Sequence, residues 1–242
     1  MNEISVGGII SRSVSIWFRN IIPFTLVSAI VYLPMLIYAA LVIGDPTLDG
    51  FNRWQIGNAF VPRVFGLIAT GAVTYGVFQQ LRGSHASMAR SMGVGLSRLL
   101  PVLVLSFVVG LISVLGTLAL IVPGAILTCM LFVAVPAAII ERVGLGAALK
   151  RSAELTSGYK WTIFGMLFVI GGVQGVTLFI IQRVLVGAQV DSFDEMKSLI
   201  VFETVFLVLV SSFQAVIGAV TYHDLRVAKE GVATDELARV FD

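Results

Sequence analysis

Charged residues are scarce in this chain. Of its 242 residues, 12% are charged and 57% are hydrophobic, and the mean hydropathy is +0.98. Soluble domains carry about 25% charged residues, and one soluble domain of this length cannot bury so much apolar surface. The composition therefore excludes an ordinary water-soluble fold and predicts that lipid surrounds most of the chain.

Residues that build catalytic and metal sites are also few. The one cysteine, Cys129, lies in a hydrophobic run, which excludes an intrachain disulfide. The two histidines, His85 and His223, have no cysteine or second histidine at metal-ligand spacing. A phosphate loop, a nucleophile elbow and an H-E-x-x-H motif are all missing. We expect no catalytic residues, metal or cofactor, and the net charge of +2 does not indicate nucleic-acid binding.

Long uncharged runs are what the chain has instead, at residues 21–44, 64–81, 99–140, 161–182 and, with one acid, 198–221. A helix needs about 20 apolar residues to cross the bilayer core. Run 99–140 has 42 residues and as one helix would be about 63 Å long. We therefore expect two spans there, separated at Val122-Pro123-Gly124, because proline and glycine disfavour helix continuation. The prediction is an all-α integral membrane protein with six transmembrane helices.

The basic residues predict how these spans are oriented. If the N-terminus is cytoplasmic, the segments on that side hold twelve Lys and Arg residues, and the opposite side holds four. Basic residues favour the cytoplasmic side. We expect a multi-pass membrane protein with both termini cytoplasmic. It would be a single membrane domain of residues 1–242 with a short cytoplasmic tail at 231–242. The start of the chain lacks a signal-peptide layout, so the first span is expected to be uncleaved.

Three segments that each carry an Arg-Ser pair precede the odd-numbered spans, at residues 9–20, 87–98 and 147–160. In the first two, the arginine lies 11 residues before a proline. This recurrence predicts a triplicated helix hairpin, with repeat units at approximately 4–83, 84–144 and 145–230. The alternative is that topology alone produces the pattern, because cytoplasmic segments before odd-numbered spans are basic in any such protein.

These segments have helical amphipathicity. In the first, Val6, Ile10, Val14 and Trp17 share one side, and polar residues occupy the other. We expect three interfacial helices whose basic residues face lipid headgroups. In the third segment, Arg151 is expected to point outward. The alternative is ordinary topological anchoring. The candidates for contact with anionic headgroups are Arg12, Arg19, Arg90, Arg98, Lys150 and Arg151.

Polar residues within the spans are Gln174, Glu203 and Gln214. Intramembrane ionisable groups are costly and often functional, but Glu203 lies near the outer interface, where it can be hydrated or paired. Gln174 and Gln214 can hydrogen-bond between the fifth and sixth spans. The three residues either line a polar path or hold helices together.

Small residues predict the faces on which spans pack. Gly171 and Gly175 form a GxxxG pattern in the fifth span, and Ser211 and Ala215 are similarly spaced in the sixth. Small residues let helix backbones approach closely in lipid. Such faces suit a compact bundle, a homo-oligomer or a membrane-protein partner equally well.

Short motifs add a resemblance to a known family. They are LIVPG at 120–124, ERVG at 141–144, ALKRS at 148–152, LTSG at 155–158 and the segment 222–231. Together they resemble the bacterial membrane domain associated with glycerophosphoryl diester phosphodiesterases. The resemblance covers nearly the whole chain and implies a six-helix membrane module. In some relatives this module precedes a soluble phosphodiesterase domain; residues 1–242 contain no such domain.

Three functions fit this sequence. The first is a non-enzymatic protein that binds or organises lipid, or scaffolds partners, through a basic cytoplasmic collar. The second is a transporter or lipid-translocating protein with a path at the repeat interface. The third is an accessory subunit of a larger membrane complex.

Overall fold

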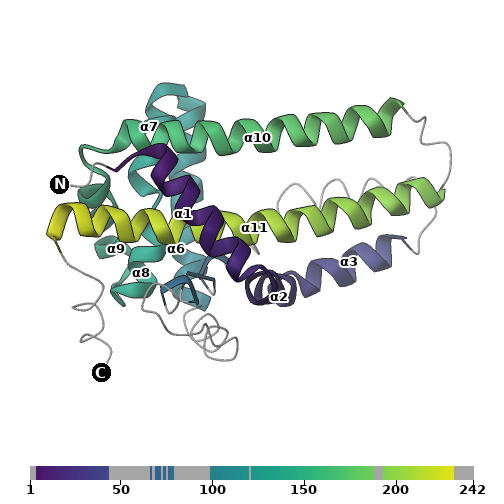
Figure 1. Ribbon diagram of the computed structural model, residues 1–242, viewed down its shortest axis with the longest axis horizontal. Coiled ribbons are helices and arrows are strands. Elements are labelled where there is room, and N and C mark those ends of the chain that lie inside the picture. Colours follow the sequence, from purple (N-terminus) through teal and green to yellow (C-terminus); the bar gives the residue numbers. More distant parts are fainter. Residues whose placement is uncertain are drawn as a thin grey trace.

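The computed structural model describes residues 4–43, 66, 69–71, 73–74, 76–78, 99–119, 121–187 and 193–231. Within these ranges the chain is helical and contains no strand, which confirms the all-helical class. The helices are α1 (Val6–Arg19), α2 (Ile21–Val31), α3 (Leu33–Ile43), α6 (Leu99–Ala119), α7 (Ile121–Leu131), α8 (Ala134–Ile140), α9 (Leu145–Thr156), α10 (Lys160–Gly187) and α11 (Phe193–Glu230) (Figure 1).

Three helical stretches of the described chain are long and apolar enough to cross a membrane: Val122–Ile140, Lys160–Thr177 and Val201–Glu230. The bent pair α1 and α2 makes a fourth if it is one span. The fold is thus compatible with a membrane protein. Half of the run at 64–81 and the tail at 232–242 lie outside the described residues.

The amphipathic helix α1 meets the apolar helix α2 at an angle of 84°. Proline has no N–H, so Pro23 cannot donate to the carbonyl of Arg19, and its ring clashes with that carbonyl in a continuous helix. The helix therefore ends at Arg19. Asn20 occupies the corner, where its side-chain amide donates to the carbonyl of Ile16 at 3.0 Å.

The predicted first span, at 21–44, consists of two helices. Helix α2 ends at Val31, and α3 begins at Leu33. Pro34 is again the cause, because it cannot donate to the carbonyl of Ile30. The backbone N–H of Leu36 donates to the carbonyl of Tyr32 at 2.9 Å and keeps the two helices joined.

Helices α6 and α7 form the hairpin predicted within residues 99–140, but the break lies earlier than expected. Helix α6 ends at Ala119, and α7 begins at Ile121. Pro123 is thus in the first turn of α7, where no intrahelical N–H bond is needed. The helices approach closely at Gly116, where an added Cβ would lie 3.2 Å from the Cα of Gly124.

Helix α9 packs against the break between α7 and α8. Ser152 and Thr156 are fully buried on its inner face. Their hydroxyls donate to the carbonyl of Met130 at 2.7 Å and 3.3 Å. Met130 lies in the last turn of α7, whose carbonyls lack helical partners. The serine of the Arg151-Ser152 pair therefore supplies a hydrogen-bond donor to the C-terminal end of α7.

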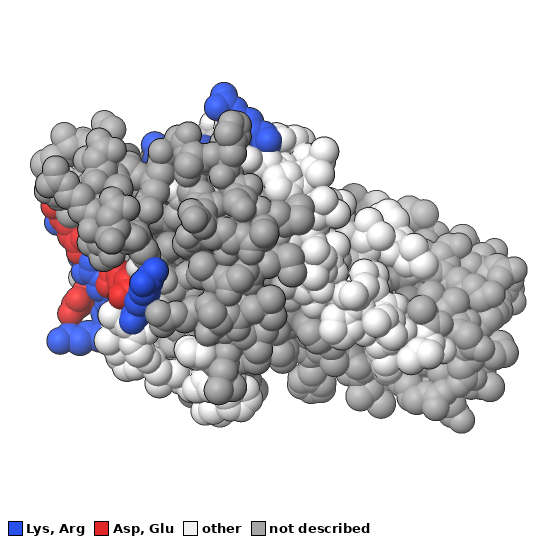
Figure 2. Space-filling view, turned by 90° about the horizontal axis from the view of Figure 1, so that it is seen from below, with Lys and Arg blue, Asp and Glu red and all other residues white. Residues whose placement is uncertain are grey.

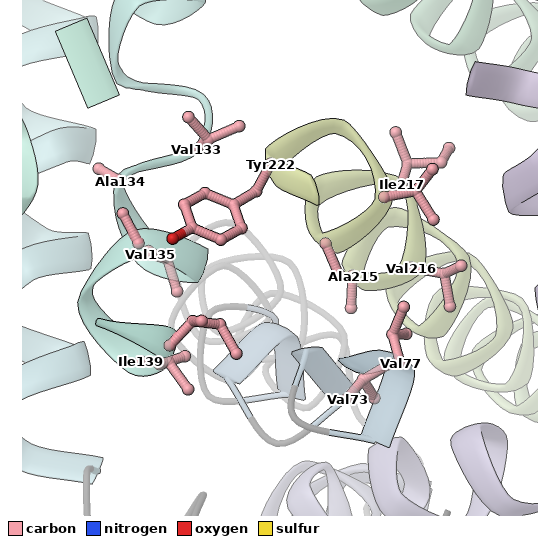
Figure 3. Packing of buried hydrophobic residues seen from close by; sticks show 14 of the residues in the cluster. Val73, Val77, Val133, Ala134, Val135, Ile139, Ala215, Val216, Ile217 and Tyr222 are labelled. Carbon is pink, nitrogen blue, oxygen red and sulfur yellow. The ribbon is translucent and has the colours of Figure 1, made fainter. Parts of the chain in front are cut away.

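The core surrounds the C-terminal half of α11, the yellow helix of Figure 1. This helix has 38 residues, so it is about 57 Å long. Figure 3 shows the ring of Tyr222 reaching from α11 toward Ala134 and Val135 at the start of α8. Helix α1 also packs along α11. Much of α10, by contrast, exposes apolar side chains such as Phe168 and Val173, as a lipid-facing helix does.

Candidate lipid-facing collar and ion-pair network

Charged side chains gather at one end of the molecule, over α1, α9 and the end of α11 (Figure 2). We call this the charged end. These elements, the turns beside them and the first residue of α10 carry its described charged residues: Arg12, Arg19, Glu141, Arg142, Lys150, Arg151, Glu154, Lys160, Asp224, Arg226, Lys229 and Glu230. Eight of these are basic and four are acidic. This is the end that the basic residues predict to be cytoplasmic.

Five of its side chains form a closed ring that joins α8, α9 and α11. Glu141 accepts hydrogen bonds from Arg151 Nε at 2.7 Å and from the Tyr222 hydroxyl at 2.6 Å. Glu230 accepts one from Arg226 Nε at 2.9 Å and is also bonded by the second arm of Arg151. Arg226 closes the ring by donating to the Tyr222 hydroxyl at 3.3 Å.

The ring balances its own charge. Two carboxylates face two guanidinium groups, and these four side chains are only 16% to 24% exposed. Buried charges are stable only when they are paired and hydrogen-bonded. Burial would lower the pKa of Arg151, but its hydrogen bonds to Glu141 and Glu230 raise the pKa overall. The ring therefore holds the end of α11 to the α8–α9 corner.

A second ion pair joins α1 to α11. The Arg12 guanidinium donates to the carboxylate of Asp224. His223 Nδ1 lies 3.3 Å from the same carboxylate oxygen, and the Nε2 of this buried histidine has no hydrogen-bond partner among the residues that the structure describes. Further along the two helices, the Trp17 indole donates to the Ser212 hydroxyl at 2.8 Å. Helix α1 is thus docked on α11 by polar contacts at two levels.

Two of the three Arg-Ser pairs play the same structural part. In Arg12-Ser13 and in Arg151-Ser152, the serine is fully buried and the arginine pairs with a carboxylate of α11. Arg151 therefore faces the protein, so its predicted outward orientation is wrong. The reason is that Glu141 and Glu230 lie on neighbouring elements and attract it. The pair Arg90-Ser91 lies outside the described residues.

The ring residues of α8 and α11 were not singled out by sequence reasoning. Arg226 and Glu230 are four residues apart in one helix, a spacing typical of an ion pair. Glu141 is the acid that ends a 42-residue uncharged run. Both signals were present, but nothing in the sequence indicates that these residues meet Arg151 and Tyr222.

The headgroup candidates fall into three groups. Arg19 and Lys150 are exposed, and Lys150 lies 3.8 Å from Glu154 one turn later. Arg12 and Arg151 are paired with carboxylates. Arg90 and Arg98 lie outside the described residues.

Two further lysines belong with these candidates. Lys160 is half-buried and begins α10 beside Trp161, whose side chain is exposed, and Lys229 is exposed near the end of α11. Lys229 also donates to the carbonyl of Glu154 at 2.7 Å. We call Arg19, Lys150, Lys160 and Lys229 the basic collar.

The polar residues predicted within the spans are partly brought together. Gln214 Nε2 donates to Gln174 Oε1 at 3.2 Å, which confirms a hydrogen bond between α10 and α11. Glu203 is half-buried in α11. The guanidinium group of Arg183 lies 5.1 Å from the centre of the Phe179 ring, a cation–π geometry.

The predicted packing residues have different environments. Ser211 and Ala215 are buried in α11, as expected of a packing face. Gly171 and Gly175 are exposed on α10, and an added Cβ at either would meet no other atom within 4 Å in the part of the chain that the structure describes. The GxxxG face of α10 is therefore open.

Comparisons of the chain with protein-family models, with curated proteins and with solved structures found no match. The resemblance to the six-helix phosphodiesterase-associated module stays a prediction. Function is therefore inferred from the residues and contacts described above.

Proposed function

We propose that this chain is a non-enzymatic bacterial inner-membrane protein that binds and organises anionic lipid through its basic collar. It would cross the membrane six times, with both termini cytoplasmic and interfacial helices before the odd-numbered spans. The carrying observation is that basic residues adjoin exposed aromatic residues at the corners where amphipathic helices meet apolar ones. Arg19 follows Phe18, which is 63% exposed, and Lys160 precedes Trp161, which is 85% exposed.

Such corners match the chemistry of the membrane interface. Aromatic side chains favour the headgroup level, and basic side chains there attract anionic lipid. The 84° bend supports the same assignment. If α2 crosses the bilayer, α1 lies nearly in the membrane plane, as interfacial helices do.

The charge balance of the charged end also supports lipid binding. Its four acids, Glu141, Glu154, Asp224 and Glu230, are fewer than its eight basic residues. Arg12, Arg151 and Arg226 pair with three of those acids. The remaining positive charge lies mostly on the exposed collar, where a lipid phosphate can reach it.

A lipid-competition measurement tests this function. The protein is reconstituted in phosphatidylcholine vesicles, and brominated phosphatidylglycerol is added to quench the exposed Trp161. The triple substitution Arg19→Gln, Lys150→Gln and Lys229→Gln should lower the association of phosphatidylglycerol relative to phosphatidylcholine by at least fivefold. Each basic residue near an anionic surface contributes about 1 kcal/mol. Arg183→Gln, at the other end of α10, is the control and should change little. Equal quenching in the triple variant and the wild type would contradict the proposal.

One observation weighs against transport as the main function. A polar path at the repeat interface would need its polar side chains turned toward the passenger, but Gln174 and Gln214 bond to each other. The open GxxxG face of α10 favours a second role, as an accessory subunit or a homo-oligomer that packs through Gly171 and Gly175.

A further inference from the structure

The two described Arg-Ser pairs differ in how firmly the arginine is held. Arg151 bonds two carboxylates, Glu141 and Glu230, and its side chain is 22% exposed. Arg12 pairs with Asp224, and its side chain is 50% exposed. The Asp224 side chain is only 11% exposed, so this ion pair is open to solvent on its arginine side alone. Arg12 can therefore turn toward a second partner in the solvent or lipid, whereas Arg151 is enclosed by its two carboxylates.

The exposed side of α1 presents groups that suit a phosphate. Arg12, Ser15 and Arg19 are all exposed, at spacings of three and four residues that put them on one helix face. Two guanidinium groups and a hydroxyl supply donors for phosphate oxygens. Phe18 before the bend and Ile22 after it are also exposed, next to this face. Donors beside apolar side chains suit a phospholipid better than a free anion.

If Arg12 leaves Asp224, this carboxylate still has a neighbouring group that can donate to it. The Asp224 side chain is 11% exposed and lies within 3.3 Å of His223 Nδ1, which can donate to it. Helix α1 would also stay docked, because Trp17 keeps its hydrogen bond to Ser212. The exchange therefore costs one partly exposed ion pair and leaves the fold in place.

We propose that the Arg12–Ser15–Arg19 face of α1 binds the phosphate of an anionic phospholipid, and that this phosphate competes with Asp224 for Arg12. The inference rests on the proposed lipid-binding function and adds both a location and a regulator. Asp224 acts as an internal competitor that sets how strongly the face binds lipid. Ring residue Glu230 has no such effect, because Arg151 keeps Glu141 when Glu230 is neutralised.

The test uses the intact chain with Trp54→Phe and Trp161→Phe, which leaves Trp17 in α1 as the sole tryptophan. In phosphatidylcholine vesicles, quenching by brominated phosphatidylglycerol reports lipid next to α1. Asp224→Asn should raise the relative association of phosphatidylglycerol about fivefold, the effect of one basic residue at an anionic surface. Arg12→Gln should lower it, and Glu230→Gln should leave it unchanged. Soluble glycerol phosphate should not displace the lipid; displacement would overturn the assignment to phospholipid.

A second measurement keeps the test valid if a variant folds poorly. In the wild type, amide hydrogen exchange of α1 should be slower in vesicles with phosphatidylglycerol than in phosphatidylcholine alone, because the bound lipid adds contacts to a helix that stays docked. Unchanged exchange and unchanged association in Asp224→Asn would overturn the competition, and the proposed function would stand if the collar variant still loses lipid. If the collar variant also keeps its lipid, the proposed function itself fails.

Discussion

The serines of the two described Arg-Ser pairs have different polar environments. Ser152 donates to the carbonyl of Met130 at 2.7 Å, whereas the Ser13 hydroxyl is buried and has no hydrogen-bond partner in the described part of the chain. What the two share is small size, which lets an amphipathic helix approach its neighbour. The arginine beside each serine then reaches a carboxylate of α11. The pair thus combines a close contact with an ion pair.

Arg151 is the residue whose loss should cost most at the charged end. Arg151→Gln removes one of the two guanidinium groups that Glu141 and Glu230 share, so the free energy of unfolding should fall by about 2 kcal/mol, less than for a fully buried pair. Lys150→Gln, one position earlier and exposed, should change it by less than about 0.5 kcal/mol. Both values can be measured by unfolding in mixed detergent micelles. Equal effects of the two substitutions would show that the ring does not stabilise the fold.

At the scale of elements, proline positions explain where helices end. Pro23 ends α1 at the corner, Pro34 separates α2 from α3, and Pro123 is tolerated in the first turn of α7. These outcomes follow from the missing N–H and the fixed ring of proline. The direction that each helix takes after a break depends on its packing.

The hairpin of α6 and α7 gives a matched pair of glycine substitutions. An alanine Cβ at Gly116 would lie 2.8 Å from Leu127 Cδ1 and 3.2 Å from the Gly124 backbone, whereas at Gly110 it would meet nothing within 4 Å. Gly116→Ala should therefore lower the free energy of unfolding by about 1 to 3 kcal/mol through overpacking. Gly110→Ala should be neutral or slightly stabilising, because alanine favours helix more than glycine does. Thermal unfolding in detergent compares the two; a larger loss in Gly110→Ala would contradict the close approach.

At the scale of the whole molecule, α11 runs from the charged end along the length of the molecule (Figure 1). Its length of about 57 Å exceeds the bilayer core of about 30 Å, so part of the helix would extend beyond the lipid if α11 crosses a membrane. Its last residues carry Asp224 and Glu230, which bind α1 and α9. The end of α11 is thus held by ion pairs, and the stretch before it by apolar packing.

The orientation of the molecule can be tested by labelling. In a Cys129→Ala background, Lys150→Cys should be cytoplasmic and Arg183→Cys should face the opposite side. A membrane-impermeant maleimide added to right-side-out vesicles should label Arg183→Cys directly and Lys150→Cys only after permeabilisation. The reverse pattern would contradict the predicted topology. Labelling of both in sealed vesicles would show that α10 does not cross the membrane.

The sequence predicted local features well. Composition indicated apolar helices, and periodicity placed amphipathic helices before apolar ones. The positions of Gln174 and Gln214 within their two spans favoured the hydrogen bond that the structure contains. The predicted orientation of Arg151 was wrong. Its side chain turns toward Glu141 and Glu230, which are 10 and 79 residues away along the chain. The open face at Gly171 was also not predictable, because GxxxG marks a capacity for close packing and not a partner.

By itself, the sequence determined the helical class of the chain and the order of its amphipathic and apolar helices, because these depend on composition and periodicity. Only the tertiary structure decided which basic residues remain available to lipid. Arg12 and Arg151 look alike in the sequence, yet one is half-exposed beside one carboxylate and the other is enclosed by two. Electrostatic partners are set by distance in space, and that distance exists only after α1, α8 and α9 have packed on α11.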